Sequence, residues 1–101
     1  MRLVMAVVRP AQVETVRAAL ASVQVTRMTV CDVHGYDLAA DTLAQEALVE
    51  IAVNDDFVER TLAAVDAVLA AGGRDGATRL FTLPMLDAVQ LYREVRGPEA
   101  V

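Results

Sequence analysis

One pattern occurs twice in this chain: an apolar run of strand length leads directly into an amphipathic helical segment. The first copy covers residues 2–23 and the second covers residues 48–73. A short continuous apolar run favours a buried strand, whereas apolar residues three and four positions apart favour a helix that packs one face on a core. Two such halves restrict the chain to a two-layer domain in which helices cover a sheet.

Both helical segments have recognisable ends. Pro10 suits the first turn of the first helix, because proline lacks the N–H that this turn would leave unpaired. Asp56, with Glu59 three residues later, resembles a capping box at the start of a helix predicted within residues 54–73. Gly72 and Gly73 supply a C-terminal stop. The apolar stripes are Val13, Val16, Leu20 and Val23 in the first helix, and Val58, Leu62, Val65 and Leu69 in the second.

Between the two halves, residues 24–36 alternate and are rich in valine and threonine, which predicts a strand that ends at Gly35. This strand is expected to pair antiparallel with a strand at residues 48–53. Residues 37–47 have no firm period, so a loop or a weak helical turn is expected there.

After the second helix, residues 78–83 predict a strand and residues 86–92 a further short one, while the tail beyond is expected to fray. The predicted fold class is therefore α+β: a ferredoxin-like βαββαβ domain with an extra short C-terminal strand, over residues 1–101. Such a fold hosts many functions and decides none of them.

Composition narrows the range of partners. Apolar residues make up 55% of 101 residues, which favours a second hydrophobic surface covered by another subunit over a dense monomeric core. The net charge of −5 disfavours a nucleic-acid partner. A single cysteine, Cys31, and the lack of an apolar segment long enough for a signal peptide or a membrane span lead us to expect a cytoplasmic protein without membrane insertion.

Residues 70–81, "AAGGRDGATRLF", allow two interpretations. Glycines let a loop turn its N–H groups toward a phosphate, and arginine binds phosphate in a bidentate manner, so this segment is a candidate phosphate loop. Alternatively, the glycines end the helix and the arginines are solvated. Nothing elsewhere resembles a catalytic group, and His34 has no Cys or His partner at metal-ligand spacing.

Several segments resemble the PII signal-transduction family. "VVRPAQVETVRAALASVQVTRMTVCDVHGY" is similar to that family's first strand, helix and second strand, and "VEIAVNDDFVERTLAAV" to its third strand and second helix. "GATRLF" resembles the family's glycine loop before the next strand. The resemblance implies a homotrimer, adenine nucleotides (AMP, ADP or ATP) bound between subunits, and a loop that docks on a transporter or enzyme.

By the same resemblance, ten positions are expected to contact or flank the nucleotide. Gln90 and Tyr92 stand where the family has two phosphate-binding arginines, a loss that a monophosphate or diphosphate tolerates better than a triphosphate. Arg93 and Arg96 are candidates to replace them. The ten expected nucleotide-binding residues are Thr29, Gly35, Tyr36, Glu50, Gly73, Arg74, Gly76, Arg79, Gln90 and Tyr92.

Other positions depart from the family. The effector loop is shortened to residues 37–47. Ala39 falls near the family glutamine that helps hold Mg²⁺ and 2-oxoglutarate, and Glu46 falls on the lysine that pairs with 2-oxoglutarate. Binding of 2-oxoglutarate and Mg²⁺ is therefore not expected. Three functions remain open: a PII-like nucleotide-sensing regulator that is not an enzyme, a degenerate trimer that docks without sensing nucleotide, or, least favoured, a small ferredoxin-fold enzyme.

Overall fold

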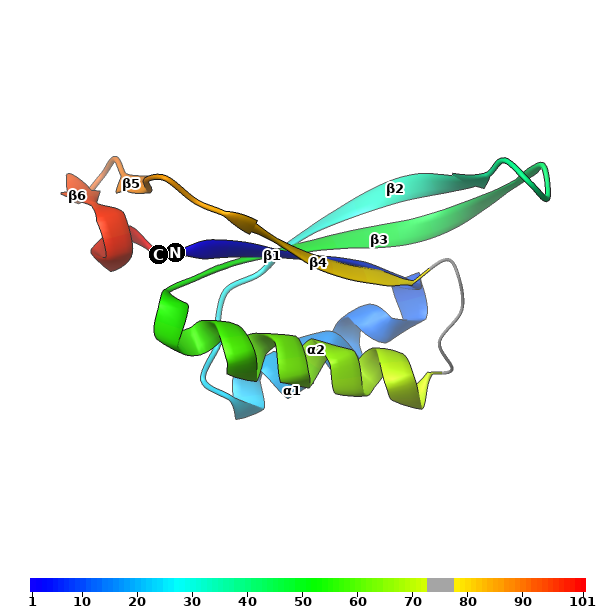
Figure 1. Cartoon of the computed structure of the whole chain (residues 1–101), viewed down its shortest axis with the longest axis horizontal. Coiled ribbons are helices and arrows are strands. Elements are labelled where there is room, and N and C mark those ends of the chain that lie inside the picture. Colours follow the sequence, from blue (N-terminus) through cyan, green and yellow to red (C-terminus); the bar gives the residue numbers. More distant parts are fainter. Residues whose placement is uncertain (73–77) are drawn as a thin grey trace.

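The structure is a computed structural model that describes residues 1–72 and 78–101. A four-stranded antiparallel sheet lies over two α-helices, with strand order β2-β3-β1-β4 (Figure 1). The strands are β1 (Arg2–Val8), β2 (Thr29–Asp37), β3 (Thr42–Val53) and β4 (Arg79–Pro84). This order confirms the ferredoxin-like α+β prediction.

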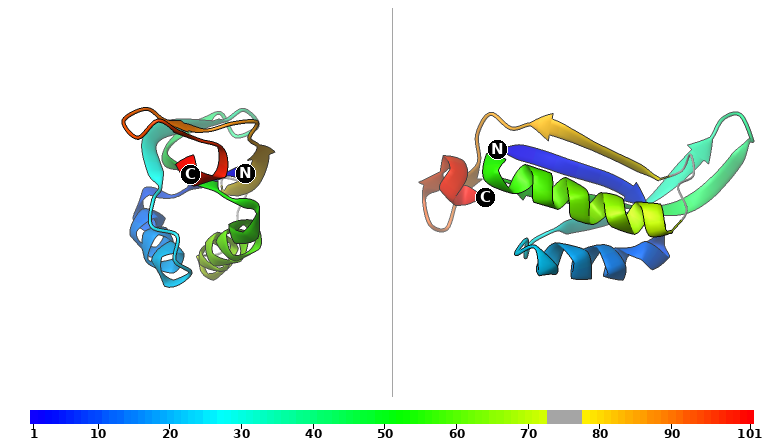
Figure 2. Two further views of the ribbon diagram at one scale, coloured as in Figure 1. Left: turned by 90° about the vertical axis from the view of Figure 1, so that its left-hand side faces the viewer. Right: turned by 60° about the horizontal axis from the view of Figure 1, so that its bottom comes forward.

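Both helices cover the same face of the sheet (Figure 2). Helix α1 (Val13–Ser22) follows a short 3₁₀ helix, η1 (Pro10–Gln12), and α2 (Val58–Ala71) follows η2 (Asp55–Phe57). The predicted stripes face the core, because Val16, Leu20, Val65 and Leu69 are buried together with alternate residues of the central strands, Val4, Ala6, Val8, Ala47, Val49, Ile51 and Val53.

The prediction of a loop at residues 37–47 is wrong. Strand β2 continues through Gly35 to Asp37, and β3 already begins at Thr42, so the two strands form a long hairpin closed by residues 38–41. We call this hairpin, residues 33–46, the arm; it projects past the helices at the end of the sheet opposite the chain termini (Figure 1). The carboxylate of Asp37 accepts the N–H groups of Ala39 and Ala40 at 3.0 and 3.1 Å, which stabilises the turn locally.

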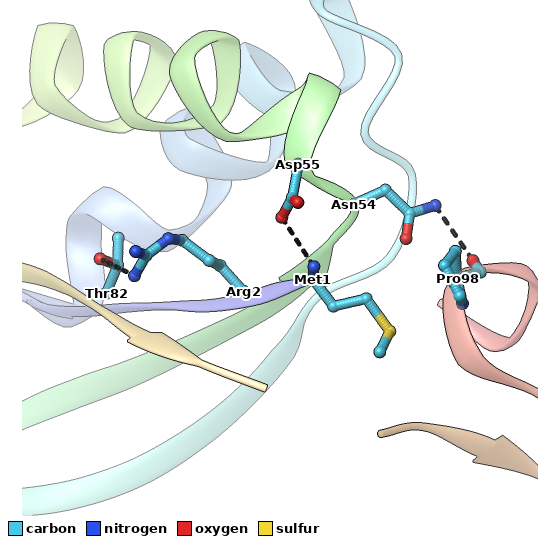
Figure 3. Close-up of polar contacts among 6 residues, drawn as sticks. All are labelled: Met1, Arg2, Asn54, Asp55, Thr82 and Pro98. Carbon is cyan, nitrogen blue, oxygen red and sulfur yellow. Dashed lines mark hydrogen bonds and ion pairs between the residues drawn. The ribbon is translucent and has the colours of Figure 1, made fainter. Parts of the chain in front are cut away.

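The strand predicted from residue 24 starts only at Thr29, because residues 24–28 form a connection in which Gln24 has a φ of 66°. The capping box of Asp56 and Glu59 does not form, since α2 begins after η2 and no side chain caps it. Instead, the Asp55 carboxylate accepts a hydrogen bond from the Met1 ammonium, with 2.7 Å between the nitrogen and Oδ1 (Figure 3). Tertiary contacts therefore fix this helix start.

The tail is ordered rather than frayed. Of the predicted strand at residues 86–92, only β5 (Val89–Gln90) forms, and it pairs with β6 (Val95–Arg96) in a separate small sheet. A 3₁₀ helix, η3 (Gly97–Ala100), then returns to the main domain, where the Asn54 amide donates to the Pro98 carbonyl at 3.0 Å (Figure 3).

The second face of the sheet carries no helix from the described part of the chain (Figure 2). Strand pairing aligns its side chains in rows across the strands. One row contains Leu83, Leu3 and Ala52, the next Phe81, Met5, Glu50 and Thr29, and the third Arg79, Val7, Leu48 and Cys31. We call these three rows the open face; they are mostly apolar, and Phe81 and Leu83 remain 42% and 46% exposed.

Candidate functional site

Two of the expected nucleotide-binding residues lie side by side. Thr29 pairs directly with Glu50 across β2 and β3. Both line a hollow of about 640 Å³ at the end of the sheet away from the arm, and Arg17 and Arg27 also line it. Arg17 is held by Glu14 in an ion pair, which raises the pKa of the arginine and lowers the pKa of the carboxyl.

Gln90 lines a second hollow, of about 310 Å³, between the tail and the connections at the ends of β2 and β3. Its amide nitrogen donates to the Ala100 carbonyl at 3.1 Å, so this side chain also holds η3 in place. The two hollows share the lining residues Thr26, Arg27, Ala52 and Val101. Tyr92 lies in the turn between β5 and β6, is 78% exposed and lines neither hollow.

Gly35 and Tyr36 lie in the arm, six and seven residues along β2 from Thr29, a separation of roughly 20 Å. The Tyr36 hydroxyl donates to the Asp41 carboxylate, and this hydrogen bond raises the pKa of the phenol. Gly35 lies beneath the side chain of Glu46, which is only 8% exposed.

Arg79 begins β4, on the opposite edge of the sheet from Thr29. Its side chain is on the open face beside Val7, three strands away from β2, which corresponds to about 14 Å. The predicted residues Gly73, Arg74 and Gly76 lie outside the residues that the structure describes.

Five of the seven described site residues fall into two groups, and Arg79 and Tyr92 lie apart from both. Thr29, Glu50 and Gln90 surround the joined hollows near the termini, whereas Gly35 and Tyr36 lie in the arm at the other end. One small ligand does not reach both groups within a single copy of the chain, because the separation exceeds the length of most nucleotides. A complete site of these residues needs two copies.

Comparison with known protein families agrees with this fold and strand order. The family model for nitrogen regulatory protein P-II matches residues 1–95. The chain belongs to the PII family. This membership confirms the resemblance inferred from the sequence motifs.

Curated members of the PII family align along the whole chain. It is 30% identical to nitrogen regulatory protein GlnK1 of Methanosarcina mazei over 114 aligned residues, covering 100% of this chain and 97% of that protein. It is 28% identical to nitrogen regulatory protein P-II of Rhizobium etli over 113 aligned residues, covering 100% of both. This PII chain therefore aligns over nearly the full length of its relatives.

Two residues of this PII protein, Arg27 and Glu46, were not among the expected nucleotide-binding residues, and the structure shows their surroundings. Arg27 is the one charged side chain among the described residues that line both hollows, and Glu46 is a buried carboxylate whose Oε2 has no hydrogen-bond partner in residues 1–72 and 78–101. Arg27 is detectable in the sequence as an arginine with no acidic residue three or four positions away. Glu46 is not, because its burial depends on the register that places it over Gly35.

Within residues 1–72 and 78–101, no three His, Cys, Asp or Glu side chains gather in a way that would hold a metal ion. Neither described α-helix is long and apolar enough to cross a membrane.

Proposed function

We propose that this PII protein is a regulator, not an enzyme, that assembles as a homotrimer and binds an adenine nucleotide in the clefts between copies. The observation that supports the trimer is the apolar character of the open face. Its apolar rows lie opposite the helices and are uncovered in a single copy, and exposed apolar patches of this kind favour association. Packing of three such faces against one another would bury Phe81 and Leu83.

The nucleotide proposal rests on the division of the site residues. One copy would contribute Gly35, Tyr36 and Arg79, and its neighbour would contribute Thr29 and Glu50 beside the joined hollows. The Thr29 hydroxyl and the Glu50 carboxylate can accept hydrogen bonds from the amino group of a base. The arginines supply the charge that phosphates need.

The preferred ligands are ADP and AMP rather than ATP, because Gln90 and Tyr92 stand where arginines would help to bind a triphosphate. Binding of 2-oxoglutarate is not part of this proposal. Glu46 places a carboxylate where an anionic effector would need a positive charge, and Ala39, in the arm turn, has no polar side chain.

The output would come from the arm. Its tip exposes Leu38 and Leu43, with 86% and 64% of each side chain accessible, and apolar side chains at a protruding tip suit insertion into a groove of a target protein. We propose a transporter or an enzyme as that target. The alternative, docking without nucleotide sensing, keeps the arm and the trimer but removes the ligand.

Light scattering and calorimetry test both parts of this proposal. Light scattering is expected to give three times the chain mass, and Phe81→Glu is expected to reduce it, because a charge would be buried in the interface. A single-copy mass for the wild type would contradict the trimer. Calorimetric titration is expected to detect ADP binding, and Glu50→Gln is expected to weaken it. A trimer that binds no adenine nucleotide would favour the alternative.

A further inference from the structure

Two amide side chains, Asn54 and Gln90, hold η3 and line the same 310 Å³ hollow. Asn54 Nδ2 donates to the Pro98 carbonyl at 3.0 Å, and Gln90 Nε2 donates to the Ala100 carbonyl at 3.1 Å. Figure 3 shows the Asn54 nitrogen toward Pro98 and the oxygen on the other side. A carbonyl oxygen only accepts hydrogen bonds, so these contacts fix which end of each amide is the nitrogen. The amide oxygens take no part in holding the tail.

Both of these amide oxygens are buried. Asn54 Oδ1 and Gln90 Oε1 have no hydrogen-bond partner among residues 1–72 and 78–101. A buried amide oxygen without a donor is unfavourable, and native structures supply that donor from the protein, from water or from a ligand. Two such oxygens at one hollow therefore indicate a place for a group that brings N–H donors from outside the chain.

The charged groups around the hollow balance one another. Arg27 and Arg93 line it, and so do Glu99 and the C-terminal residue Val101 with its carboxylate. Neither guanidinium group forms an ion pair or a hydrogen bond with another residue of the described ranges. The guanidinium groups would repel a simple cation, and the carboxylates would repel a simple anion. A ligand that carries one charge of each sign fits this balance.

Part of the lining is apolar. Val25 and Val53 are 8% and 4% exposed, and both line the hollow together with Phe57. Apolar walls with a few polar groups are typical of sites for small molecules, and a volume of about 310 Å³ is at the lower end of the range for such sites. The hollow therefore suits a small ligand with a short aliphatic part between its polar ends.

We propose that this hollow binds a small α-amino acid with an aliphatic side chain. The ammonium group of the ligand donates to Asn54 Oδ1 and Gln90 Oε1, and its carboxylate pairs with a guanidinium group of the lining. Its side chain lies against the two valines. The site does not depend on the proposed nucleotide function, because neither Thr29 nor Glu50 lines this hollow. Because the same two amides hold η3, the bound amino acid stabilises the tail in its folded path.

Calorimetry on the full chain with three probes tests which groups of the ligand are recognised. The probes are L-valine, isovalerate, which lacks the ammonium group, and isobutylamine, which lacks the carboxylate. L-valine is expected to bind, and each of the other two is expected to bind about tenfold or more weakly, in line with the loss of a charge-assisted hydrogen bond. Equal binding of L-valine and either fragment would overturn the proposal. If none of the three binds, the hollow holds water alone and the proposal is likewise overturned.

Two substitutions of Gln90 separate recognition of the ammonium group from support of the tail. Gln90→Lys keeps a donor for the Ala100 carbonyl but removes the acceptor, so it is expected to weaken L-valine binding about tenfold or more. Gln90→Glu keeps acceptor oxygens but removes the donor, so it is expected to retain L-valine binding. Gln45→Lys, at an exposed position in the arm, is the matched control for the added charge and is expected to leave binding unchanged.

The two variants give opposite results if the tail alone matters. Unchanged binding in Gln90→Lys, or lost binding in Gln90→Glu, would show that binding does not follow the acceptor and would overturn the proposal. Circular dichroism of each variant verifies that the fold is intact. L-valine binding in a protein that binds no adenine nucleotide would leave this site standing and contradict only the nucleotide proposal.

Discussion

The carboxyl group of Glu46 occupies the space directly above Gly35, where a Cβ at position 35 would stand. Strand pairing explains the contact: Glu46 pairs with Val33, so its side chain reaches diagonally across β2 to Gly35. The base of the arm is therefore packed by a carboxylate lying over a glycine, and its Oε2 is buried without a hydrogen-bond partner among the described residues.

This contact predicts coupling between the two positions. In a Glu46→Ala background, Gly35→Ala is expected to stabilise the protein by about 0.5–1 kcal/mol, because alanine loses less backbone entropy than glycine on folding. In the wild-type background the new Cβ must displace the Glu46 carboxyl group, so that gain is expected to vanish or reverse. A double-mutant cycle of unfolding free energies measures the difference. Equal effects of Gly35→Ala in both backgrounds would show that the two side chains do not compete.

The contact between Met1 and Asp55 predicts a dependence of stability on pH. The Met1 ammonium lowers the pKa of Asp55, first through its hydrogen bond and then through its charge. A carboxyl whose pKa is lower in the folded state contributes stability above its unfolded pKa of about 3.9, and this contribution is lost as the pH falls through the folded value. Asp55→Asn is therefore expected to lower the melting temperature at pH 6, and this penalty is expected to shrink as the pH falls below about 3.9.

Asp56→Asn is the control for this effect, because Asp56 is exposed beside Asp55 and has no ion pair in the described structure. The Asp55 effect is expected to be small, since that side chain is 85% exposed, and to shrink in high salt. An Asp55→Asn penalty that persists unchanged at pH 3 would mean that the ion pair is not its source.

The arm turn predicts an altered tyrosine titration. The hydrogen bond from the Tyr36 hydroxyl to Asp41 raises the pKa of Tyr36, so this bond stabilises the arm while the phenol is protonated and is lost as the pH rises through the raised value above about 10. The chain has two tyrosines, so a Tyr92→Phe variant isolates Tyr36. Its phenolate absorbance is expected to appear at lower pH once Asp41→Asn is added. Asp32→Asn, on the same strand, serves as the control, and an unchanged titration curve after Asp41→Asn would contradict the contact.

Burial of Ile51 at the centre of the sheet predicts a large loss of unfolding free energy when its side chain is truncated. Ile51 is fully buried in β3, against the helices, so Ile51→Ala is expected to cost about 2–5 kcal/mol of unfolding free energy through lost burial and a cavity. Leu86→Ala removes the same kind of side chain from a fully exposed position and is expected to change stability by less than about 0.5 kcal/mol. Chemical denaturation measures both, and similar losses for the two variants would place Ile51 outside the core.

The helical stripes and the central strands could be predicted because they depend on local periodicity. Val16, Leu20, Val65 and Leu69 repeat at helical spacing, and burial of one face per element requires that spacing wherever the elements pack. The arm could not be predicted in the same way. Both faces of its strands are largely exposed beyond the helices, so no alternation of buried and exposed residues is imposed on residues 37–47.

The sequence by itself determined the order of strands and helices, the core stripes and, through its motifs, the family. It also identified the candidate residues Thr29, Glu50 and Gln90. Only the tertiary structure decided how these residues group, because contacts between distant segments depend on strand register and on the path of the tail. For the same reason, only the structure placed Glu46 over Gly35.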